Sequence, residues 1–341
     1  MNIRNVATLC SIDHVGIAHY TCPMTFFINF PSWISPEIIP GLPFRWYGLM
    51  YVVAFSITYF LIVLQARKKE IDLEGDKPLD LVLYCIIGLV LGARLFSVLI
   101  YDGTWYYWTH PWKIFWPFEN GSFVGLPGMS YHGGLVGAIV GAWFFKRKNH
   151  MNFMNIADTI CYAAPLGYTF GRLGNFINGE LFGRVSSKSW AMIFPNASRF
   201  STDYSWVRQF ADSLSIPYTQ GQLLNLPRHP SQLYEALFEG FVLFLFLWFV
   251  IRPKREKQPY GFGFSVYLMG YGLVRFVLEY FRAPDENIGY VLALGRKHDT
   301  IALFQSFFNF SMGQVFCLAM VLFGLGLLLF LKRKGKRPGT R

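Results

Sequence analysis

Long apolar segments constrain this chain more than any other feature. Seven stretches of about twenty mainly apolar residues follow one another, and each is long enough to cross the ~30 Å hydrocarbon core of a bilayer as an α-helix. They comprise residues 46–66, 81–101, 124–145, 153–175, 232–251, 262–281 and 311–331. Because backbone groups in lipid must be hydrogen-bonded within the segment, the pattern predicts an all-α integral membrane protein with about seven transmembrane helices.

The composition agrees with a membrane protein. Of the 341 residues, 53% are hydrophobic and only 15% are charged, whereas soluble domains carry about 25% charged residues. The formal net charge of +11 does not indicate nucleic acid as a partner, because the basic residues lie in short clusters between apolar segments. Such clusters are interpreted as topology signals and as contacts with anionic lipid head groups.

The basic clusters predict an orientation. They follow the odd-numbered segments, at residues 67–69, 146–148, 252–257 and 332–337. The positive-inside rule then places the N-terminus outside and the C-terminus in the cytoplasm. The resulting organisation is an N-terminal extension (1–43), a transmembrane domain (44–331) and a basic cytoplasmic tail (332–341).

Residues 184–228 form a polar insertion between the fourth and fifth apolar segments. One interpretation is a plain connecting loop. A length of more than forty residues instead favours a structured element, and we expect a small cap on the external, periplasmic side.

The cysteines and histidines show no metal-binding pattern. Five cysteines include no C-x-x-C pair, and seven histidines include no H-x-x-x-H pair, so neither a metal site nor a cofactor is predicted. Cys10 and Cys22 would be able to form a disulfide if the N-terminus is outside, because disulfides persist in oxidising compartments.

Residues 171–183, with the sequence GRLGNFINGELFG, interrupt the apolar pattern. They carry Arg172, Asn175, Asn178 and Glu180 within nine positions. Polar and ionisable groups at membrane depth are costly, so they persist mainly where they meet a partner, water or substrate. The four glycines permit close approach of a ligand and a broken helix.

A second polar pattern lies in the sixth segment. Tyr271, Arg275, Glu279 and Arg282 are four, four and three residues apart, which places them on one stripe of a helix. One interpretation is an Arg275–Glu279 ion pair that holds helices together. The other is a cationic site, partly balanced by its own glutamate, that binds phosphate through guanidinium groups.

Two histidines and a tyrosine complete the candidates. His132, followed by two glycines, is able to exchange a proton near neutral pH, although a hydrogen bond between helices would also explain it. His229 precedes the fifth segment, where Glu235 and Glu239 share a helical face. At least one of them is expected to pair with an arginine such as Arg94 or Arg172. Tyr47 begins the first segment, where an interfacial anchor is the simpler interpretation.

Several of these blocks, taken in order, resemble the bacterial phosphatidylglycerol–prolipoprotein diacylglyceryl transferases. The similar blocks are residues 45–48, 131–134, 171–183, 229–235 and 271–285. The resemblance covers roughly residues 44–331. It implies a multi-pass protein of the bacterial cytoplasmic (inner) membrane. Its substrates would be phosphatidylglycerol and prolipoprotein signal peptides with a lipobox cysteine.

The resemblance implies a reaction at an sp³ carbon. The lipobox thiol attacks C3 of the glyceryl unit, a thioether forms and glycerol 1-phosphate leaves. Arg172 and Arg275 are the expected phosphate ligands, supported by Asn175 and Tyr271. His132 is the candidate base.

The remaining expected site residues also come from the resemblance. Glu180 and Glu279 would orient the arginines or share proton transfer. Arg282 and His229 would bind phosphatidylglycerol, and Tyr47 matches a family motif position, with the individual roles of Tyr47 and His229 left open.

Two other classes of protein remain as alternatives. A membrane lipid or anion transporter would line a passage with buried arginines and would need a conduit that reaches both leaflets. A structural scaffold would use the same charges only to join helices.

Overall fold

The structure is mainly helical. The computed structural model describes residues 27–39, 41–42, 44–101, 105–119, 121–123, 125, 128–283, 289–295 and 300–334. Within these residues, four helices are long and apolar enough to cross a membrane: Trp46–Arg67, Lys77–Ile100, Ser231–Lys257 and Met312–Lys334. Phe262–Leu278 is a shorter apolar helix. These lengths and compositions define a multi-pass membrane protein with a few short strands.

The chain divides into two compact units, which are described separately. The first unit is Met1–Val52, Tyr168–Val242 and Gly270–Val321, and the second is Val53–Gly167, Leu243–Met269 and Leu322–Arg341. Four helices contribute residues to both: α1 (Trp46–Arg67), α5 (Phe153–Ile177), α9 (Phe262–Leu278) and α10 (Met312–Lys334).

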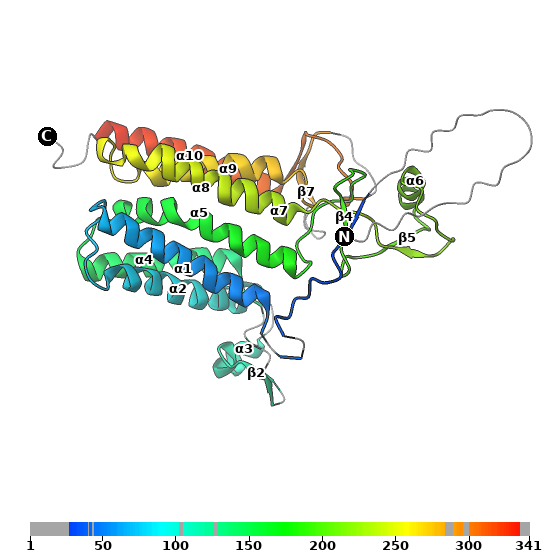
Figure 1. Ribbon diagram of the computed structural model, residues 1–341, viewed down its shortest axis with the longest axis horizontal. Helices are drawn as coiled ribbons and strands as arrows, with labels where there is room; N and C mark the ends of the chain where they lie inside the picture. Colours follow the sequence, from blue (N-terminus) through cyan, green and yellow to red (C-terminus); the bar gives the residue numbers. More distant parts are fainter. Residues whose placement is uncertain are drawn as a thin grey trace, which may run out of the picture. The chain divides into compact units, whose positions relative to one another are not determined.

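The second unit is built around a close pair of helices, α2 (Lys77–Phe96) and α4 (Tyr131–Asn149), which lie side by side (Figure 1). A methyl group added at Gly137 would lie 2.0 Å from the carbonyl oxygen of Gly88, and one at Gly92 would lie 2.3 Å from that of Gly133. Glycines at these positions therefore allow the two helix backbones to pack closely. Shorter elements complete this unit: η1 (Ser97–Tyr101), α3 (Tyr106–Thr109), η2 (Pro111–Ile114), β2 (Phe118–Glu119), β3 (Ser122–Phe123), α8 (Leu243–Leu245), η4 (Phe246–Ile251) and η5 (Arg252–Lys257).

Polar residues of the second unit have structural partners. Asp158 is fully buried and accepts hydrogen bonds from the backbone N–H groups of Gly261 (2.9 Å) and Phe264 (2.8 Å) at the start of α9. Arg255 donates to Asn155 Oδ1 (2.6 Å) and to Thr159 Oγ1 (2.9 Å). The carboxylate that weakens the apolar pattern of the fourth segment thus satisfies donors at a helix N-terminus.

The first unit contains the polar insertion. Its elements are β1 (Ile28–Asn29), β4 (Met192–Ile193), β5 (Phe200–Ser201), α6 (Ser205–Ser213), β6 (Leu223–Leu224), α7 (Ser231–Glu235), η3 (Ala236–Val242), β7 (Tyr290–Ala293) and β8 (Asn309–Ser311). Val185, Val207 and Leu226 form a small buried core within the insertion. Because β1 pairs in parallel with β4, part of the N-terminal extension is paired with the insertion.

The predicted start of one helix needs correction, and the end of another lies within the glycine-rich motif. The third segment becomes helical only at Tyr131, seven residues after the predicted start, because Ser130 Oγ caps the helix by accepting from Gly133 N (3.2 Å). The glycine-rich motif, which permits a broken helix, continues α5 as far as Ile177, and the chain turns at Gly179, whose φ is +64°.

Two further predictions concern residues that the structure does not describe. The possible Cys10–Cys22 disulfide and residues 335–341 of the basic tail lie outside the described ranges.

Candidate active site

The glycine-rich motif, residues 171–183, packs closely on the start of α1. Arg172 and Asn175 lie in the last turns of α5. A methyl group added at Gly174 would lie 3.2 Å from Met50 Cβ and 3.4 Å from Tyr47 Cδ2 of α1. The glycine therefore allows the two helices to approach, and Tyr47 lies beside the motif.

Glu235, at the end of α7, joins the predicted arginines. Its Oε2 lies 3.0 Å from Arg172 Nε, and its Oε1 lies 2.9 Å from Arg275 Nη1. Arg282 Nη1 is more distant, at 3.7 Å from the same Oε1. The side chain of Glu235 is only 1% exposed. The expected pairing of this face with Arg172 is confirmed, whereas Arg94 belongs to the second unit and donates to Ile114 O and Tyr107 OH.

Arg275 is surrounded by carboxylates. Besides Glu235, its Nη1 contacts Glu239 Oε1 (3.3 Å) and its Nη2 contacts Glu279 Oε2 (2.7 Å). Ser311 Oγ donates to the other oxygen of Glu279 (3.0 Å). The predicted i, i+4 ion pair is confirmed, and a guanidinium with several carboxylate contacts is strongly held in its place.

Tyr168 connects Arg172 with Glu239, one of the carboxylates around Arg275. The sequence did not predict this residue. Its hydroxyl accepts a hydrogen bond from Arg172 Nε (2.7 Å) and donates to Glu239 Oε2. Its ring also lies edge-on to that of Tyr271, with 6.1 Å between centroids. The available signal was its i, i+4 spacing from Arg172 on α5.

The charges of this cluster nearly cancel. Three arginines face three glutamates whose side chains are at most 8% exposed: Arg172, Arg275 and Arg282, with Glu235, Glu239 and Glu279. Buried charges require such partners. Three glutamates therefore balance the arginines, whereas the pattern of the sixth segment indicated only Glu279. Within the described ranges, no group of His, Cys, Asp and Glu is arranged to hold a metal ion.

Two of the arginines keep donors available. Arg172 uses Nε and Nη1, while its Nη2 has no hydrogen-bond partner among the residues that the structure describes. Arg282 is 25% exposed and its contact with Glu235 is long. Arg275, by contrast, has both terminal nitrogens on carboxylates.

A chain of hydrogen bonds leads from Arg172 to a polar cavity. Arg172 Nη1 donates to Asn175 Oδ1 (3.4 Å), and Asn175 Nδ2 donates to Glu180 Oε1 (3.0 Å). Glu180 also accepts from Asn178 Nδ2 (3.3 Å). Both Asn178 and Glu180 line a cavity of about 690 Å³, together with Arg45 and Phe182. The motif thus links a buried ionic cluster to an open polar space within one unit.

His229 lies two residues before the start of α7. Its backbone oxygen accepts from Gly183 N (2.8 Å), and a methyl group at Gly183 would lie 3.0 Å from His229 Cβ. Its Nδ1 hydrogen bonds with Tyr234 OH (3.2 Å). Burial, together with the nearby cations of Lys188 and Arg184, lowers the pKa of His229 to about 4. The imidazole is therefore neutral at physiological pH.

His132 belongs to the other unit. It lies in the first turn of α4, where it is exposed and its ring is 5.7 Å from that of Tyr131. Nine of the ten predicted site residues therefore lie in the first unit. The tenth, His132, lies on α4 in the second unit.

Apolar helices and a buried ionic cluster that hydrogen bonds link to a polar cavity define a multi-pass membrane protein with an internal polar site. The family model of prolipoprotein diacylglyceryl transferase matches residues 35–330, and the chain belongs to this family.

Curated relatives cover nearly the whole chain. The phosphatidylglycerol–prolipoprotein diacylglyceryl transferases of Treponema denticola and Treponema pallidum are both 46% identical to it. The alignments cover 92% of this chain in each case, with 97% and 98% of the relatives. The protein of that name from Chlorobaculum tepidum is 39% identical, over 92% of this chain and 95% of its own.

The lowered pKa of His229 predicts a pH dependence of stability. Between pH 6.5 and about 4, the unfolded chain binds a proton at this histidine that the folded chain does not, so stability falls as the pH falls through this window. We expect the thermal unfolding midpoint to depend less steeply on pH in His229→Asn than in the parent, measured in detergent.

The exposed His150, whose φ of +53° asparagine tolerates, offers a matched control. His150→Asn should keep the slope of the parent. An unchanged slope in His229→Asn would contradict the neutral assignment.

Proposed function

We propose that this chain transfers the diacylglyceryl group of phosphatidylglycerol to the lipobox cysteine of prolipoproteins, the first step of lipoprotein maturation. The observation that carries the proposal is the buried arginine cluster, with an open donor on Arg172, in a chain 46% identical to transferases of that name. The thiol loses its proton, sulfur bonds to C3 of the glyceryl unit, and the C3–O bond breaks to release glycerol 1-phosphate.

The open donors favour Arg172 and Arg282 as ligands of the phosphate. Guanidinium groups bind phosphate oxygens bidentately and remain charged when desolvated. Both have terminal nitrogens that are not consumed by short carboxylate contacts. They would stabilise the negative charge that develops on the leaving phosphate, which is the largest electrostatic demand of the reaction.

The contacts of Arg275 favour a positioning role. Its terminal nitrogens hold Glu235, Glu239 and Glu279, and Glu235 in turn fixes Arg172. Arg275 and Glu279 would then orient the phosphate ligands, with Tyr271 packed against the same cluster through Tyr168.

The polar cavity suits the glycerol head group. Glu180 and Asn178 line it, and Asn178 Oδ1 is buried without a hydrogen-bond partner among the described residues. A buried acceptor without a partner is costly, so a glycerol hydroxyl donating to it would be favourable. Asn175 connects this cavity to Arg172.

The reaction also needs a thiolate, since a thiol is a weak nucleophile. We assign the base to His132, because it is exposed on α4 and histidine is the side chain that most often serves as a general base. Tyr47, beside Gly174, would contact substrate near the motif. The neutral His229 would bind phosphatidylglycerol as a hydrogen-bonding group and not as a cation.

The membrane placement that we propose has seven spans in the bacterial inner membrane, with the N-terminus outside. The basic residues at the ends of α1, α4 and α10 support the cytoplasmic assignment of those ends. In this arrangement residues 184–228 form a periplasmic cap between residues of the transmembrane catalytic domain (44–331), which follows the extension (1–43) and precedes the tail (332–341).

The activity and the two arginine roles are tested in one assay. The purified protein is given phosphatidylglycerol and a lipobox peptide in liposomes, and both glycerol phosphate release and peptide mass are followed. We expect Arg172→Lys and Arg275→Lys to lower turnover by at least 10²-fold, by analogy with loss of one charge-stabilising donor. Added glycerol 1-phosphate should inhibit Arg172→Lys less than the parent, and Arg275→Lys to the same degree.

The exposed Lys254→Arg should behave as the parent in every readout. Absence of release and of mass gain in the folded parent would refute the transferase proposal and leave the transporter alternative. Near-normal turnover in both arginine variants would refute the proposed cluster.

His132→Asn tests the base. If the histidine removes the thiol proton, the variant should regain part of its lost turnover as the pH rises toward the cysteine pKa of about 8.5, because the thiolate then forms without help. The measurement is the ratio of variant to parent turnover between pH 7 and 9. A constant ratio would remove the support for this role.

The orientation is tested by thiol labelling of intact cells. Cysteine introduced at the exposed Ser187 should react with a membrane-impermeant maleimide that has crossed the outer membrane. Cysteine at the exposed Lys257 should react only after the inner membrane is opened. The reverse pattern would invert the proposed topology.

A further inference from the structure

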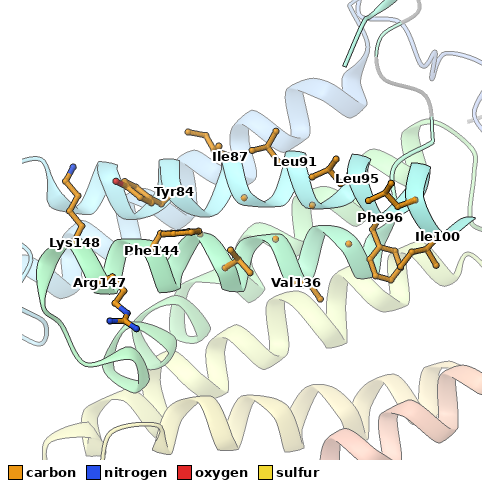
Figure 2. Close-up of a pocket in the computed structure, with 17 residues that line it drawn as sticks. Tyr84, Ile87, Leu91, Leu95, Phe96, Ile100, Val136, Phe144, Arg147 and Lys148 are labelled. Atoms are coloured by element: carbon orange, nitrogen blue, oxygen red, sulfur yellow. The ribbon is translucent and has the colours of Figure 1, made fainter. Parts of the chain in front are cut away.

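A long apolar groove runs along the α2–α4 pair of the second unit (Figure 2). Its volume is about 860 Å³. Apolar side chains from both helices line it: Ile87, Leu91, Leu95, Val136, Val140 and Phe144. None of the six is covered by the described part of the chain, since each is at least 38% exposed.

The groove is hollow because its floor has no side chains. Gly88, Gly92 and Gly137 line it, and the backbones of the two helices touch at these positions, with an ideal Cβ at Gly88 only 2.2 Å from Gly137 O. Larger residues on either side form its walls. A continuous trough with apolar walls fits a flexible hydrocarbon chain better than a flat helix surface would.

One end of the groove is basic. Arg147 and Lys148, in the last turn of α4, line it at the end where α4 stops (Figure 2). The Arg147 guanidinium lies 4.9 Å from the centroid of the Trp143 ring, and the Lys148 Nζ lies 5.7 Å from that of Tyr84. These cation–π contacts hold each cation against an aromatic ring at the end of α4.

The groove is long enough to hold a lipid chain across one leaflet. Gly133 and Lys148 both line it, and fifteen residues of α-helix span about 22 Å at 1.5 Å per residue. One leaflet accounts for about half of the ~30 Å hydrocarbon core. A chain that starts at the basic end would therefore lie in the groove through the whole of its leaflet.

We propose that this groove binds an anionic phospholipid of the bilayer, with an acyl chain between α2 and α4 and the phosphate on Arg147 and Lys148. The acyl chain covers the exposed apolar walls of the groove, and the phosphate accepts hydrogen bonds from two cationic side chains. Under the positive-inside rule this lipid belongs to the cytoplasmic leaflet.

Charge argues against two other occupants. A signal peptide carries a basic n-region on its cytoplasmic side, which would meet Arg147 and Lys148 as a like charge. A second copy of this chain packed in parallel through the same groove would bring its own Arg147 and Lys148 to the same level, with the same repulsion. An anionic lipid is the occupant whose charge complements the site.

The phosphate end of the site is separate from the residues proposed for the transfer reaction, because Arg147 and Lys148 lie in the last turn of α4 and His132 lies in its first turn. The test therefore uses phosphatidic acid, which has no glycerol head group to lose. The full-length protein is placed in phosphatidylcholine nanodiscs that contain a trace of phosphatidic acid or phosphatidylcholine with a photoreactive acyl chain. Cross-linked peptides are mapped by mass spectrometry.

We expect phosphatidic acid to label the α2 and α4 peptides about 30-fold more than phosphatidylcholine does, from the two surface cations together. Arg147→Gln/Lys148→Gln should lower this preference by about 5-fold to 30-fold, from about 5-fold per surface cation. Lys332→Gln/Arg333→Gln, which removes the same charge from exposed residues at the end of α10, should keep the preference. Val140→Trp should lower labelling by both lipids by filling the groove.

Three results would overturn the proposal: equal labelling by the two lipids in the parent, equal loss of preference in both double variants, or cross-links between two protein chains at the groove. Thermal unfolding midpoints equal to that of the parent ensure that the variants are folded. Transfer activity is measured in parallel with phosphatidylglycerol in excess, where Arg147→Gln/Lys148→Gln should match the parent. A failed transferase assay would leave the labelling result interpretable.

Discussion

The burial of Glu235 and Glu239 is the constraint on which the arrangement of the first unit depends. Both carboxylates are at most 1% exposed, and an uncompensated buried charge costs about 3–5 kcal/mol or more. Arg172 of α5 and Arg275 of α9 supply the opposite charges. The end of α5, the helix that begins with α7, and α9 must therefore converge within ion-pair distance, which gives apolar helices a specific packing that dispersion alone would not select.

The same constraint limits how strongly the cluster can hold an anion. Three guanidinium groups without carboxylates would bind a phosphate tightly and retain it. Here three glutamates reduce the net charge, so a phosphate meets directed donors in a nearly neutral surround. For the proposed reaction this is useful, because catalysis needs donors aimed at the charge of the transition state and a leaving group that departs afterwards.

Local chemistry decided how much of the fold and site was predictable. The start of α9 at Phe262 and the bounds of α1 follow from apolar length alone, and the Arg275–Glu279 pair follows from i, i+4 spacing. The late start of α4 depends on the Ser130 cap, which an apolar window does not weigh. Tyr168 and Ser311 were missed because their partners lie 71 and 32 residues away, and spacing along one helix carries no information about such pairs.

A polar residue in an apolar helix does not by itself mark a functional site, and α5 contains both kinds. Asp158 is completely buried and uses both carboxylate oxygens on backbone N–H groups of α9. Both oxygens of this carboxylate are therefore used in hydrogen bonds that stabilise the fold. Arg172, fourteen residues later on the same helix, is oriented by Tyr168 and Glu235 yet keeps Nη2 without a partner among the described residues. The difference between a satisfied group and one that is fixed in position but retains a donor separates structure from chemistry in this helix.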